Sequence, residues 1–572
     1  MSQHPTQKPR GRWITIGLAA AILFVAGTVG FQQHYAELAG VGRTPFGESI
    51  YAALRLFTIN FDGDRERVKP WLLEVARWLA PVVVSTGIFQ LLHDVFREEY
   101  QRIRIRRARA HYIVCGDDEN AETLAGQLLE KGDKVLLVRE NPHSGGGDEI
   151  QRKGAMCLAG RPESPGLLHT ARLERAKGLI LAMREDRTNV AIAMDAIEIC
   201  APHDQPLDIF THVGDTHSRD LLQRTELLVN ARGARTRVTV FNHFQNMARW
   251  LWAHVPFEVG PGTNLPSDSV HLILPGLGPS GAAIVLQAAR LGHYANLVPV
   301  TLHIVSINAA DEIAELVHLY PGLTRCCHLT AHEVRSNQEF AARAIGLAAE
   351  LGAATSVAVF TNFGDPQDGL RQAILIAEGV ASRLGVRILL RFQHANVVEK
   401  LNRRFPGVEF DLLPEAAVTF GREAVLREGL DGKARKIHEE WYDEEKKRMA
   451  GSPGRPHKAT FHPWADLTEN QKDSSRSQAE HMAIKIRAAG LFPARAKREW
   501  PHVAADAGLV EQLAAMEHNR WCADKWLDGW KYASKRNDEF KHHTDLVPYA
   551  DLDEPTKQYD RDTIIKLDRY MD

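Results

Sequence analysis

Residues 271–293 read HLILPGLGPSGAAIVLQAARLGH, and this stretch decides the fold of a large part of the chain. An apolar strand ends at a glycine-rich turn, and an apolar helix begins directly after it. Gly276, Gly278 and Gly281 have the spacing G-x-G-x-x-G, in the strand–turn–helix context that a dinucleotide-binding loop requires. We therefore predict a parallel α/β unit of the Rossmann type. Its glycines serve either a bound pyrophosphate or close packing of the helix on the strand.

The rest of this unit is expected within residues 266–430. Its second strand, LHIVSIN, ends without the acidic residue that usually binds a ribose, and Asn308 and Asp311 are the nearest candidates. Residues 355–394 supply two more buried strands and a helix, which complete a parallel sheet. A nucleotide at this glycine loop and a purely structural loop are both compatible with the pattern.

An earlier copy of the same pattern occupies residues 111–265. Its first strand, HYIVC, runs into a loop where Gly116, Asp118 and Ala121 stand in place of three glycines. Acidic side chains at this helix N-terminus repel a pyrophosphate. Arg139 occupies the position of the usual ribose-binding acid. We therefore expect a structural role for this unit and no dinucleotide in it.

The order of elements in residues 154–196 is distinctive: a strand, Gly-Arg, a helix, the strand AGLILA and then DRTN. It resembles the RCK (TrkA-N-like) domain, which regulates potassium channels and transporters, from about residue 111 to 255. The resemblance implies two RCK-like units in each chain. Such tandem domains occur in gating rings that are built from four subunits.

Two apolar stretches precede these units. Residues 13–31, WITIGLAAAILFVAGTVGF, are long enough to cross a hydrocarbon core of about 30 Å as a helix. A second span is expected at about residues 72–96, with Gly87 as a candidate gating hinge. Basic residues lie outside both spans, which favours a cytoplasmic location for both termini. A signal peptide shares the basic start and the apolar run, but the second span argues against it.

Residues 44–64, TPFGESIYAALRLFTINFDGD, lie between the two spans. A short helix is expected to lead into a segment that resembles the two-helix potassium-channel pore, whose filter reads T-V-G-Y-G-D. The matching filter positions are Thr58, Ile59, Asn60, Phe61 and Asp62. Asn60 and Asp62 replace the two filter glycines, and both residue types tolerate the left-handed backbone that glycine adopts there. The pore architecture is therefore expected without strong potassium selectivity, and an ordinary hairpin loop is the alternative.

The C-terminal part contains an internal repeat. A charge-rich linker at residues 431–456 precedes a module at residues 457–572. Within the module, PWADL at 463–467 recurs as PYADL at 548–552, and Arg476 recurs as Arg561 at the same offset. Matches at a single offset indicate a duplication.

The segment between the two copies carries L-A-x-x-x-H-x-x-W, then G-W-x-Y, then K-x-H-x-x-L-V. These motifs resemble the ryanodine-receptor repeat (RyR) domain. The resemblance implies a small helical module, with an aromatic pocket that accepts adenine nucleotides in the animal channels. The residues that we expect to bind a ligand are Trp464, His518, Arg520, Trp521, Trp530, Tyr532 and Tyr549. The alternative is that these aromatic side chains form core.

Composition excludes several classes of function. The net charge of −2 gives no bulk attraction to nucleic acid. The six cysteines are scattered and form no C-x-x-C pair, as expected of reduced thiols. No nucleophile–base pair or metal-spaced cluster of histidines and cysteines is evident, so we expect no enzyme, no catalytic residue and no metal site. A membrane-tethered oxidoreductase is disfavoured because its ribose acid is missing.

We therefore expect a multidomain protein with a two-span α-helical membrane region, two α/β Rossmann-like RCK units and a mainly α-helical RyR-type module. Its expected function is that of a ligand-gated cation channel subunit, as a homotetramer in the inner (plasma) membrane. The expected partners are membrane lipid, inorganic cations and an adenine nucleotide or dinucleotide as ligand. The alternative is a membrane-anchored, nucleotide-sensing regulator without a conduction path of its own.

Overall fold

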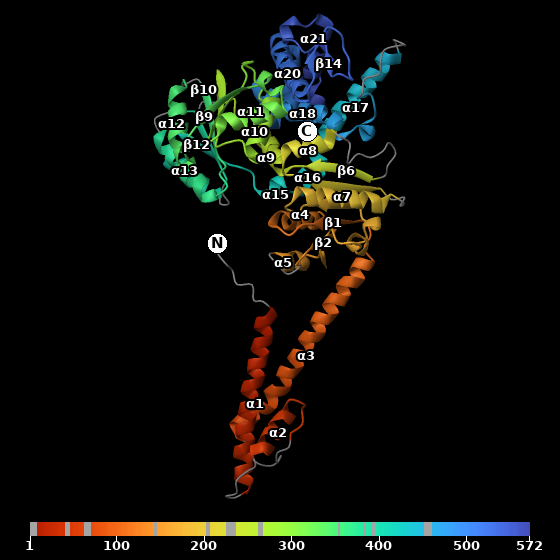
Figure 1. Ribbon diagram of the computed structural model, residues 1–572, viewed down its shortest axis with the longest axis vertical. Coiled ribbons are helices and arrows are strands. Elements are labelled where there is room, and N and C mark those ends of the chain that lie inside the picture. The colour runs from red at the N-terminus through yellow and green to blue at the C-terminus, as the bar shows by residue number, and fades with distance from the viewer. Residues whose placement is uncertain are drawn as a thin grey trace. The chain divides into compact units, whose positions relative to one another are not determined.

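The structure, a computed structural model, places most of the chain in two compact units, Met1–Arg107 and Ala108–Asp572. The residues that it describes are 9–39, 46–61, 70–141, 146–201, 206–224, 236–260, 267–352, 355–380, 385–391, 395–450 and 460–571. Figure 1 gives the order of the elements by colour. Each unit has a packed core of its own.

The first unit is a group of three helices: α1 (Pro9–Ala39), α2 (Phe46–Leu56) and α3 (Trp71–Arg106). Glycine allows α1 to approach its neighbours closely, because a Cβ atom on Gly30 would lie 2.8 Å from the backbone nitrogen of Leu73. Small buried side chains on α2 and α3, such as Ala53 and Ala76, continue this contact. The unit therefore packs through small residues, as helices in membranes do.

The outer faces of α1 and α3 are apolar and exposed. Ile14, Leu18, Ile22 and Val25 form one exposed stripe on α1. The stretches Ile14–Glu37 and Trp71–Leu91 are long and apolar enough to cross a membrane. The two expected spans, at residues 13–31 and about 72–96, therefore correspond to real helices of sufficient length.

The second unit begins with a six-stranded parallel sheet in the order β3-β2-β1-β4-β5-β6. This is the Rossmann order, in which the order of the strands reverses between β1 and β4 and leaves a crevice at their carboxyl ends. The strands are β1 (His111–Cys115), β2 (Lys134–Arg139), β3 (Met156–Ala159), β4 (Gly178–Leu181), β5 (Leu207–His212) and β6 (Thr236–Phe241).

A second sheet repeats the topology, in the order β12-β11-β10-β7-β8-β9. Phe340 of α12 (Phe340–Glu350) and Ile376 of α13 (Pro366–Gly379) pack on one of its faces. Helix α10 (Pro279–Leu291) packs on the other. The strands are β7 (Ser269–Leu274), β8 (Thr301–Ser306), β9 (His328–Glu333), β10 (Thr355–Thr361), β11 (Val386–Leu390) and β12 (Val408–Leu412). The prediction of two Rossmann-like units is confirmed.

The C-terminal region is mainly helical, as predicted. Its apolar core continues into that of the second sheet, because Trp500 and Leu513 belong to the same buried cluster as Leu274 and Tyr294. Its elements are α17 (Glu428–Ala450), η4 (Trp464–Asp466), α18 (Glu469–Ala488), α19 (Pro493–Ala505), α20 (Ala507–Leu527), the short strands β13 (Lys531–Tyr532) and β14 (His542–His543), η5 (Tyr549–Asp551) and α21 (Glu554–Ile565).

Candidate functional site

The pore-like segment ends α2 in a hydrogen-bonded turn. The backbone nitrogens of Thr58 and Asn60 both donate to the carbonyl oxygen of Arg55, at 3.0 and 3.1 Å. The left-handed residue is Ile59, with φ of 61°, rather than Asn60, where the sequence led us to expect it. The difference arises because the turn folds back on the last carbonyls of the helix. Phe61 stacks on Phe31 of α1 at 5.8 Å, and Asp62 lies outside the described residues.

The candidate hinge lies within an unbroken helix. Helix α3 continues through Pro81 and Gly87 to Arg106. A Cβ atom on Gly87 would approach only the Cγ2 atom of Ile16, at 3.9 Å, among the described residues. Gly87 as a gating hinge stays a prediction.

The first glycine-poor loop is filled by its own side chains. Asp118 caps α4 (Glu119–Glu130) by accepting a hydrogen bond from the backbone nitrogen of Ala121 at 3.0 Å. Arg139 is fully buried and donates to Glu122 at 2.8 Å and to the carbonyl oxygen of Asp117 at 3.0 Å. These contacts occupy the place where a dinucleotide would meet the loop.

In the second loop, the three glycines have three separate roles. Gly276 has a φ of 98°, which side chains rarely adopt. A Cβ atom on Gly281 would lie 2.2 Å from the carbonyl oxygen of Gly276, so this position serves helix–strand packing. By contrast, no described atom lies within 4 Å of a Cβ placed on Gly278. The loop therefore keeps open space where a phosphate would approach the start of α10.

An acid that the sequence reading missed lies against this loop. Glu312, in the first turns of α11 (Ala309–Leu319), accepts from the backbone nitrogen of Leu277 at 2.6 Å and from the Ser306 hydroxyl at 3.0 Å. Asn308 and Asp311 were the expected candidates, and they do not make these contacts. A carboxylate from the helix thus stands next to the strand end where a ribose-binding acid is usual.

The far side of the same loop faces the point where the strand order reverses. Asn362, which follows β10, donates from its amide nitrogen to the Ser280 hydroxyl at 2.7 Å. The amide oxygen of Asn362 is buried and has no hydrogen-bond partner in the described part of the chain. Glu312 and Asn362 therefore border the open glycine loop on opposite sides.

In the C-terminal module, several predicted aromatic residues come together. The ring of His518 lies 5.7 Å from Trp521 and 5.9 Å from Tyr549. His543, which the sequence reading had not selected, meets Trp521 at 4.9 Å and Trp530 at 6.0 Å. We call these five side chains the aromatic cluster.

Other predicted ligand residues lie elsewhere. Trp464 packs against His438 of α17, at 5.9 Å between ring centroids. Arg520 is buried and forms ion pairs with Glu517 and Asp524, and its role in ligand binding stays a prediction. Tyr532 remains 55% exposed.

The duplication extends further than the repeated motif. His438 and His518 each bond a backbone carbonyl oxygen, of His462 and of Val547, at 2.8 Å in both cases. The ammonium of Lys472 lies 5.5 Å from the Trp464 ring, and that of Lys557 lies 5.6 Å from Tyr549. These parallels pair α17 of the first copy with α20 of the second.

The ion pairs of the two copies also match. Arg476 forms a two-pronged pair with Asp431 at 2.7 and 2.8 Å, and Arg561 does so with Glu511 at 2.6 and 3.1 Å. The sequence offset between Asp431 and Glu511 equals the offset between His438 and His518. The sequence led us to expect that the charged helix α17 is a linker, but it makes the contacts of a first repeat. Residues 451–459, which follow it, lie outside the described part of the chain.

The neighbours of His518 favour the positively charged form of its ring. Burial lowers its pKa, but the carboxylate of Asp560, 3.4 Å away, and the thiol of Cys522 outweigh burial and raise the pKa to about 10. Its Nε2 bonds the carbonyl oxygen of Val547 at 2.8 Å, which fixes the ring under Tyr549. The aromatic cluster therefore contains a buried cation.

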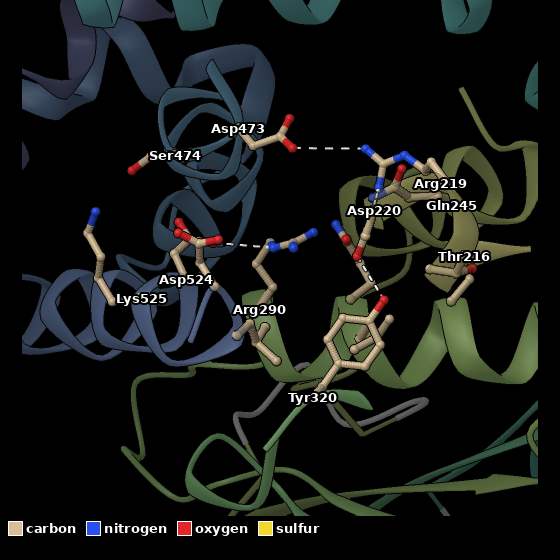
Figure 2. Close-up of a pocket in the computed structure, with 15 residues that line it drawn as sticks. Thr216, Arg219, Asp220, Gln245, Arg290, Tyr320, Asp473, Ser474, Asp524 and Lys525 are labelled. Carbon is tan, nitrogen blue, oxygen red and sulfur yellow. Dashed lines mark hydrogen bonds and ion pairs between the residues drawn. The ribbon is translucent and has the colours of Figure 1, made fainter. Parts of the chain in front are cut away.

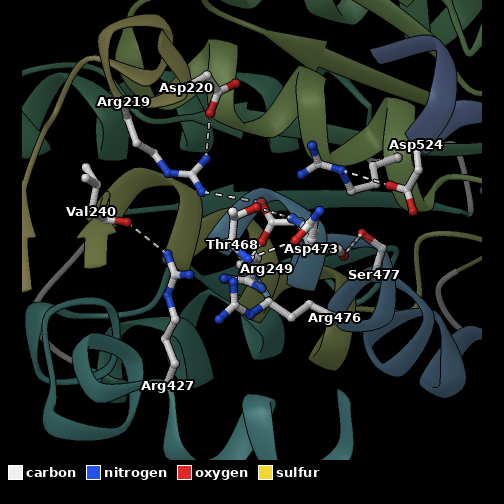
Figure 3. Close-up of polar contacts among 12 residues, drawn as sticks. Arg219, Asp220, Val240, Arg249, Arg427, Thr468, Asp473, Arg476, Ser477 and Asp524 are labelled. Atoms are coloured by element: carbon white, nitrogen blue, oxygen red, sulfur yellow. Dashed lines mark hydrogen bonds and ion pairs between the residues drawn. The ribbon is translucent and has the colours of Figure 1, made fainter. Parts of the chain in front are cut away.

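Arginines from several elements converge on Asp473 of α18, as Figure 3 shows. Burial alone raises the pKa of this carboxyl group, but Arg476, Arg219 and Arg427 outweigh burial and hold the pKa below its usual value. Arg219 belongs to α8 (Thr216–Arg224) of the first Rossmann unit. The C-terminal module is thus joined to the first Rossmann unit by buried charge.

A cavity of about 80 Å³ lies beside this junction. Figure 2 shows its polar side chains, which come from α8 and α9 (His243–His254) of the first unit, from α10 and from Tyr320 after α11 of the second, and from α18 and α20 of the C-terminal module. It is lined by Thr216, Arg219, Asp220, Gln245, Ala283, Leu286, Gln287, Arg290, Tyr320, Asp473, Ser474, Asp524, Lys525, Leu527 and Asp528.

Two family models match the sequence. The TrkA-N domain matches residues 112–230, and the RyR domain matches residues 504–571. The chain carries a TrkA-N domain and a RyR domain. The TrkA-N domain is the first Rossmann unit, and the RyR domain contains every member of the aromatic cluster.

Beyond its TrkA-N and RyR domains, the chain is similar to Potassium channel protein 1 of Methanocaldococcus jannaschii, with 26% identity over 112 residues. The match covers 18% of this chain and 30% of that relative, so the chain spans about a third of the relative's length. Together with the two long apolar helices, this similarity indicates a membrane protein.

Solved structures of the GsuK channel are also similar. The structure with bound NAD is 14% identical and covers 71% of this chain and 82% of its own, with a TM-score of 0.36. The structure with bound ADP is 15% identical and covers 72% of this chain and 97% of its own, with a TM-score of 0.35.

Proposed function

We propose that the chain is one subunit of a ligand-gated cation channel, assembled as a homotetramer in the plasma membrane with both termini in the cytoplasm. The observation that carries this proposal is the order of the parts. Two candidate membrane helices enclose the short helix α2 and its turn, and the TrkA-N and RyR domains follow. The similarity to a potassium channel protein supports this reading.

The ligand that we propose is of the nucleotide type, an adenine nucleotide or dinucleotide. The open backbone at Gly278, with Glu312 beside it, suits a phosphate and a ribose. The aromatic cluster suits a base, since stacking on an aromatic ring contributes about 1–3 kcal/mol. The two sites lie in one folded unit, so a ligand at either one biases the shape of the whole cytoplasmic part.

Gating follows from differential affinity. A ligand that binds one arrangement of the cytoplasmic units more tightly shifts the equilibrium towards that arrangement. Helix α3 leads directly into the TrkA-N domain, because it ends at Arg106 and β1 begins at His111. A change in the arrangement of these domains therefore reaches the second membrane helix through only a few residues.

The test is cation flux through liposomes that contain the purified full-length protein, with a panel of adenine and guanine nucleotides. Flux that depends on a nucleotide is expected. Thr58→Lys should abolish flux by placing a cation at the pore turn, while Thr170→Lys, on an exposed surface, should not. Nucleotide binding without any flux would instead support a membrane-anchored regulator that has no conduction path.

A further inference from the structure

The cavity among the three cytoplasmic modules contains polar atoms that lack partners. The hydroxyl of Thr216, the Nε of Arg219 and the amide oxygen of Gln245 are buried without a hydrogen bond to any described residue. These side chains are 6%, 3% and 9% exposed. A buried polar atom left unpaired costs folding free energy, so three of them around one space indicate that something fills it.

The carboxylates that line the cavity are already engaged. Asp220 accepts from Arg219 and from the Tyr320 hydroxyl, both at 2.8 Å. Asp473 accepts from Arg476 at 3.0 Å. Asp524 pairs with Arg520 and with Arg290, and Asp528 accepts from Trp530 and Lys541, both at 3.1 Å. The negative charges of the lining are therefore balanced partly by lining arginines and partly by cations outside the lining.

The cationic donors that line the cavity keep nitrogen atoms that are free to donate. Among the described residues, Arg290 forms one ion pair, from its Nε to Asp524 at 3.3 Å, while Asp473, Asp220 and Glu480 attract it from further away. The ammonium of Lys525 donates no hydrogen bond to a described residue and lies 4.8 Å from the Trp530 ring. Arg219 adds its unpaired Nε. The remaining hydrogen-bonding capacity of the cavity thus consists mostly of charged donors, which favour an oxyanion.

The duplication relates one residue of the cavity lining to a residue of the second copy. Ser474 of α18 corresponds to Tyr559 of α21, at the same offset that relates Arg476 to Arg561. The Tyr559 ring lies under the guanidinium of Arg448 at 4.4 Å and is 42% exposed. The smaller side chain of Ser474 lines the cavity instead. About 80 Å³ is several times the space of one water and suits a group of phosphate size, but not a whole nucleotide.

We propose that this cavity binds a small oxyanion, namely a phosphate group, held by Arg219, Arg290 and Lys525. The phosphate is either free or part of a nucleotide whose base stacks on Trp530, since Lys525 faces both the cavity and that ring. In the second case, the inference rests on the proposed nucleotide ligand. Because all three modules supply lining residues, the bound anion fixes their arrangement.

The experiment is calorimetric titration of the full-length protein in detergent with inorganic phosphate, with ADP and with adenosine. Ser474→Tyr places a large ring in the space, and Lys525→Met removes a donor but keeps the apolar part of the side chain. The exposed Ser534→Tyr and Lys535→Met are the matched controls. Both lining variants are expected to weaken binding by about ten- to a hundredfold, and the controls are expected to leave it unchanged.

The titrants distinguish the two sources. Free phosphate as the ligand predicts saturable phosphate binding that competes with ADP. A nucleotide phosphate predicts binding of ADP but not of adenosine, and loss of ADP affinity in Trp530→Ala as well. Absence of binding to the wild type, or equal binding by Ser474→Tyr and Ser534→Tyr, would overturn the inference. Nucleotide-dependent flux that is unaltered in Ser474→Tyr would reject this site and leave the proposed channel function intact.

Discussion

The Glu312 carboxylate lies 2.6 Å from the backbone nitrogen of Leu277, so an acid from helix α11 borders the glycine loop of the second Rossmann unit. The carboxylate also accepts from Ser306, at the carboxyl end of β8. Strand ends at this edge of a Rossmann sheet carry the residue that holds a ribose. The contact thus makes Glu312 the residue with which to test whether the loop binds a ligand.

Glu312→Ala should weaken dinucleotide binding by about ten- to a hundredfold, because hydrogen bonds to a charged group contribute about 1.5–3 kcal/mol. Titration calorimetry with NAD measures the effect. Glu315→Ala, an exposed acid one turn further along the same helix, is the matched control. Equal affinities for the two variants would show that Glu312 only braces the loop.

Gly278→Asp should abolish binding of a phosphorylated ligand at the second loop without loss of folding. The side chain has room, since no described atom lies within 4 Å of its Cβ, but its charge repels a phosphate. Asp118→Asn in the first loop should leave nucleotide affinity unaltered and preserve the helix cap, because asparagine caps as well as aspartate. Nucleotide titration of both variants makes the comparison, and similar losses would contradict the assignment.

Trp521→Ala should weaken nucleotide binding by about ten- to a hundredfold while reducing stability only modestly. The ring is partly exposed and stacks on His518 at 5.7 Å, so it is available to a base. Trp500→Ala is the contrasting change, because Trp500 is fully buried and donates to the carbonyl oxygen of Ile564. That variant should lose about 3–5 kcal/mol of unfolding free energy.

Thermal melting and titration of both variants separate the two roles of tryptophan. If Trp521→Ala melts as early as Trp500→Ala, Trp521 is a core residue. The aromatic cluster would then be structural, and nucleotide sensing would belong to the glycine loop.

Stability should fall as pH rises from about 6.5 to about 10, through His518. Its pKa is raised from 6.5 to about 10 in the folded protein by Asp560 and Cys522, against the opposing effect of burial. A raised pKa contributes stability that is fully present below 6.5 and is lost as pH passes the folded value. A tenfold difference in proton affinity between the folded and unfolded states corresponds to about 1.4 kcal/mol of unfolding free energy.

Urea unfolding of the full chain across this range checks the prediction, with Asp560→Asn as the variant that removes the carboxylate. The pH dependence should flatten in this variant. His303 provides the opposite case, because burial beside His271 and His332 lowers its pKa to about 4. Its contribution should diminish stability as pH falls from 6.5 towards 4. If His303→Gln and Asp560→Asn changed the pH dependence of stability in the same way, that result would count against both assignments.

Reversal potentials in mixed potassium and sodium should show weak discrimination between the two ions. Asn60 stands where the filter glycine of the resembling pores lies, and the turn bonds back to Arg55 instead of extending. Asn60→Gly should sharpen selectivity if the backbone at this position limits it. A strongly potassium-selective wild type would show that the substitution is harmless, and Asn141→Gly, outside the membrane unit, is the control.

The sequence by itself determined the local elements. Hydrophobic runs of membrane length, strand–glycine–helix spacing and a repeat at one offset are each encoded within short stretches of chain, so both spans, both Rossmann units and the helical module were predicted. The intact loop at Gly276 and the degraded loop at Gly116 were also distinguishable, because backbone freedom and acidic charge are properties of residue type.

Only the tertiary structure decided which distant side chains meet. Glu312 reaches the glycine loop from a helix, although the strand that usually supplies the acid ends at Ser306. His543 joins Trp521 to Trp530, while Trp464 pairs with His438 instead. The junction cavity draws on helices of both Rossmann units and of the C-terminal module. Such convergence depends on packing between elements far apart in the chain, which no local spacing specifies.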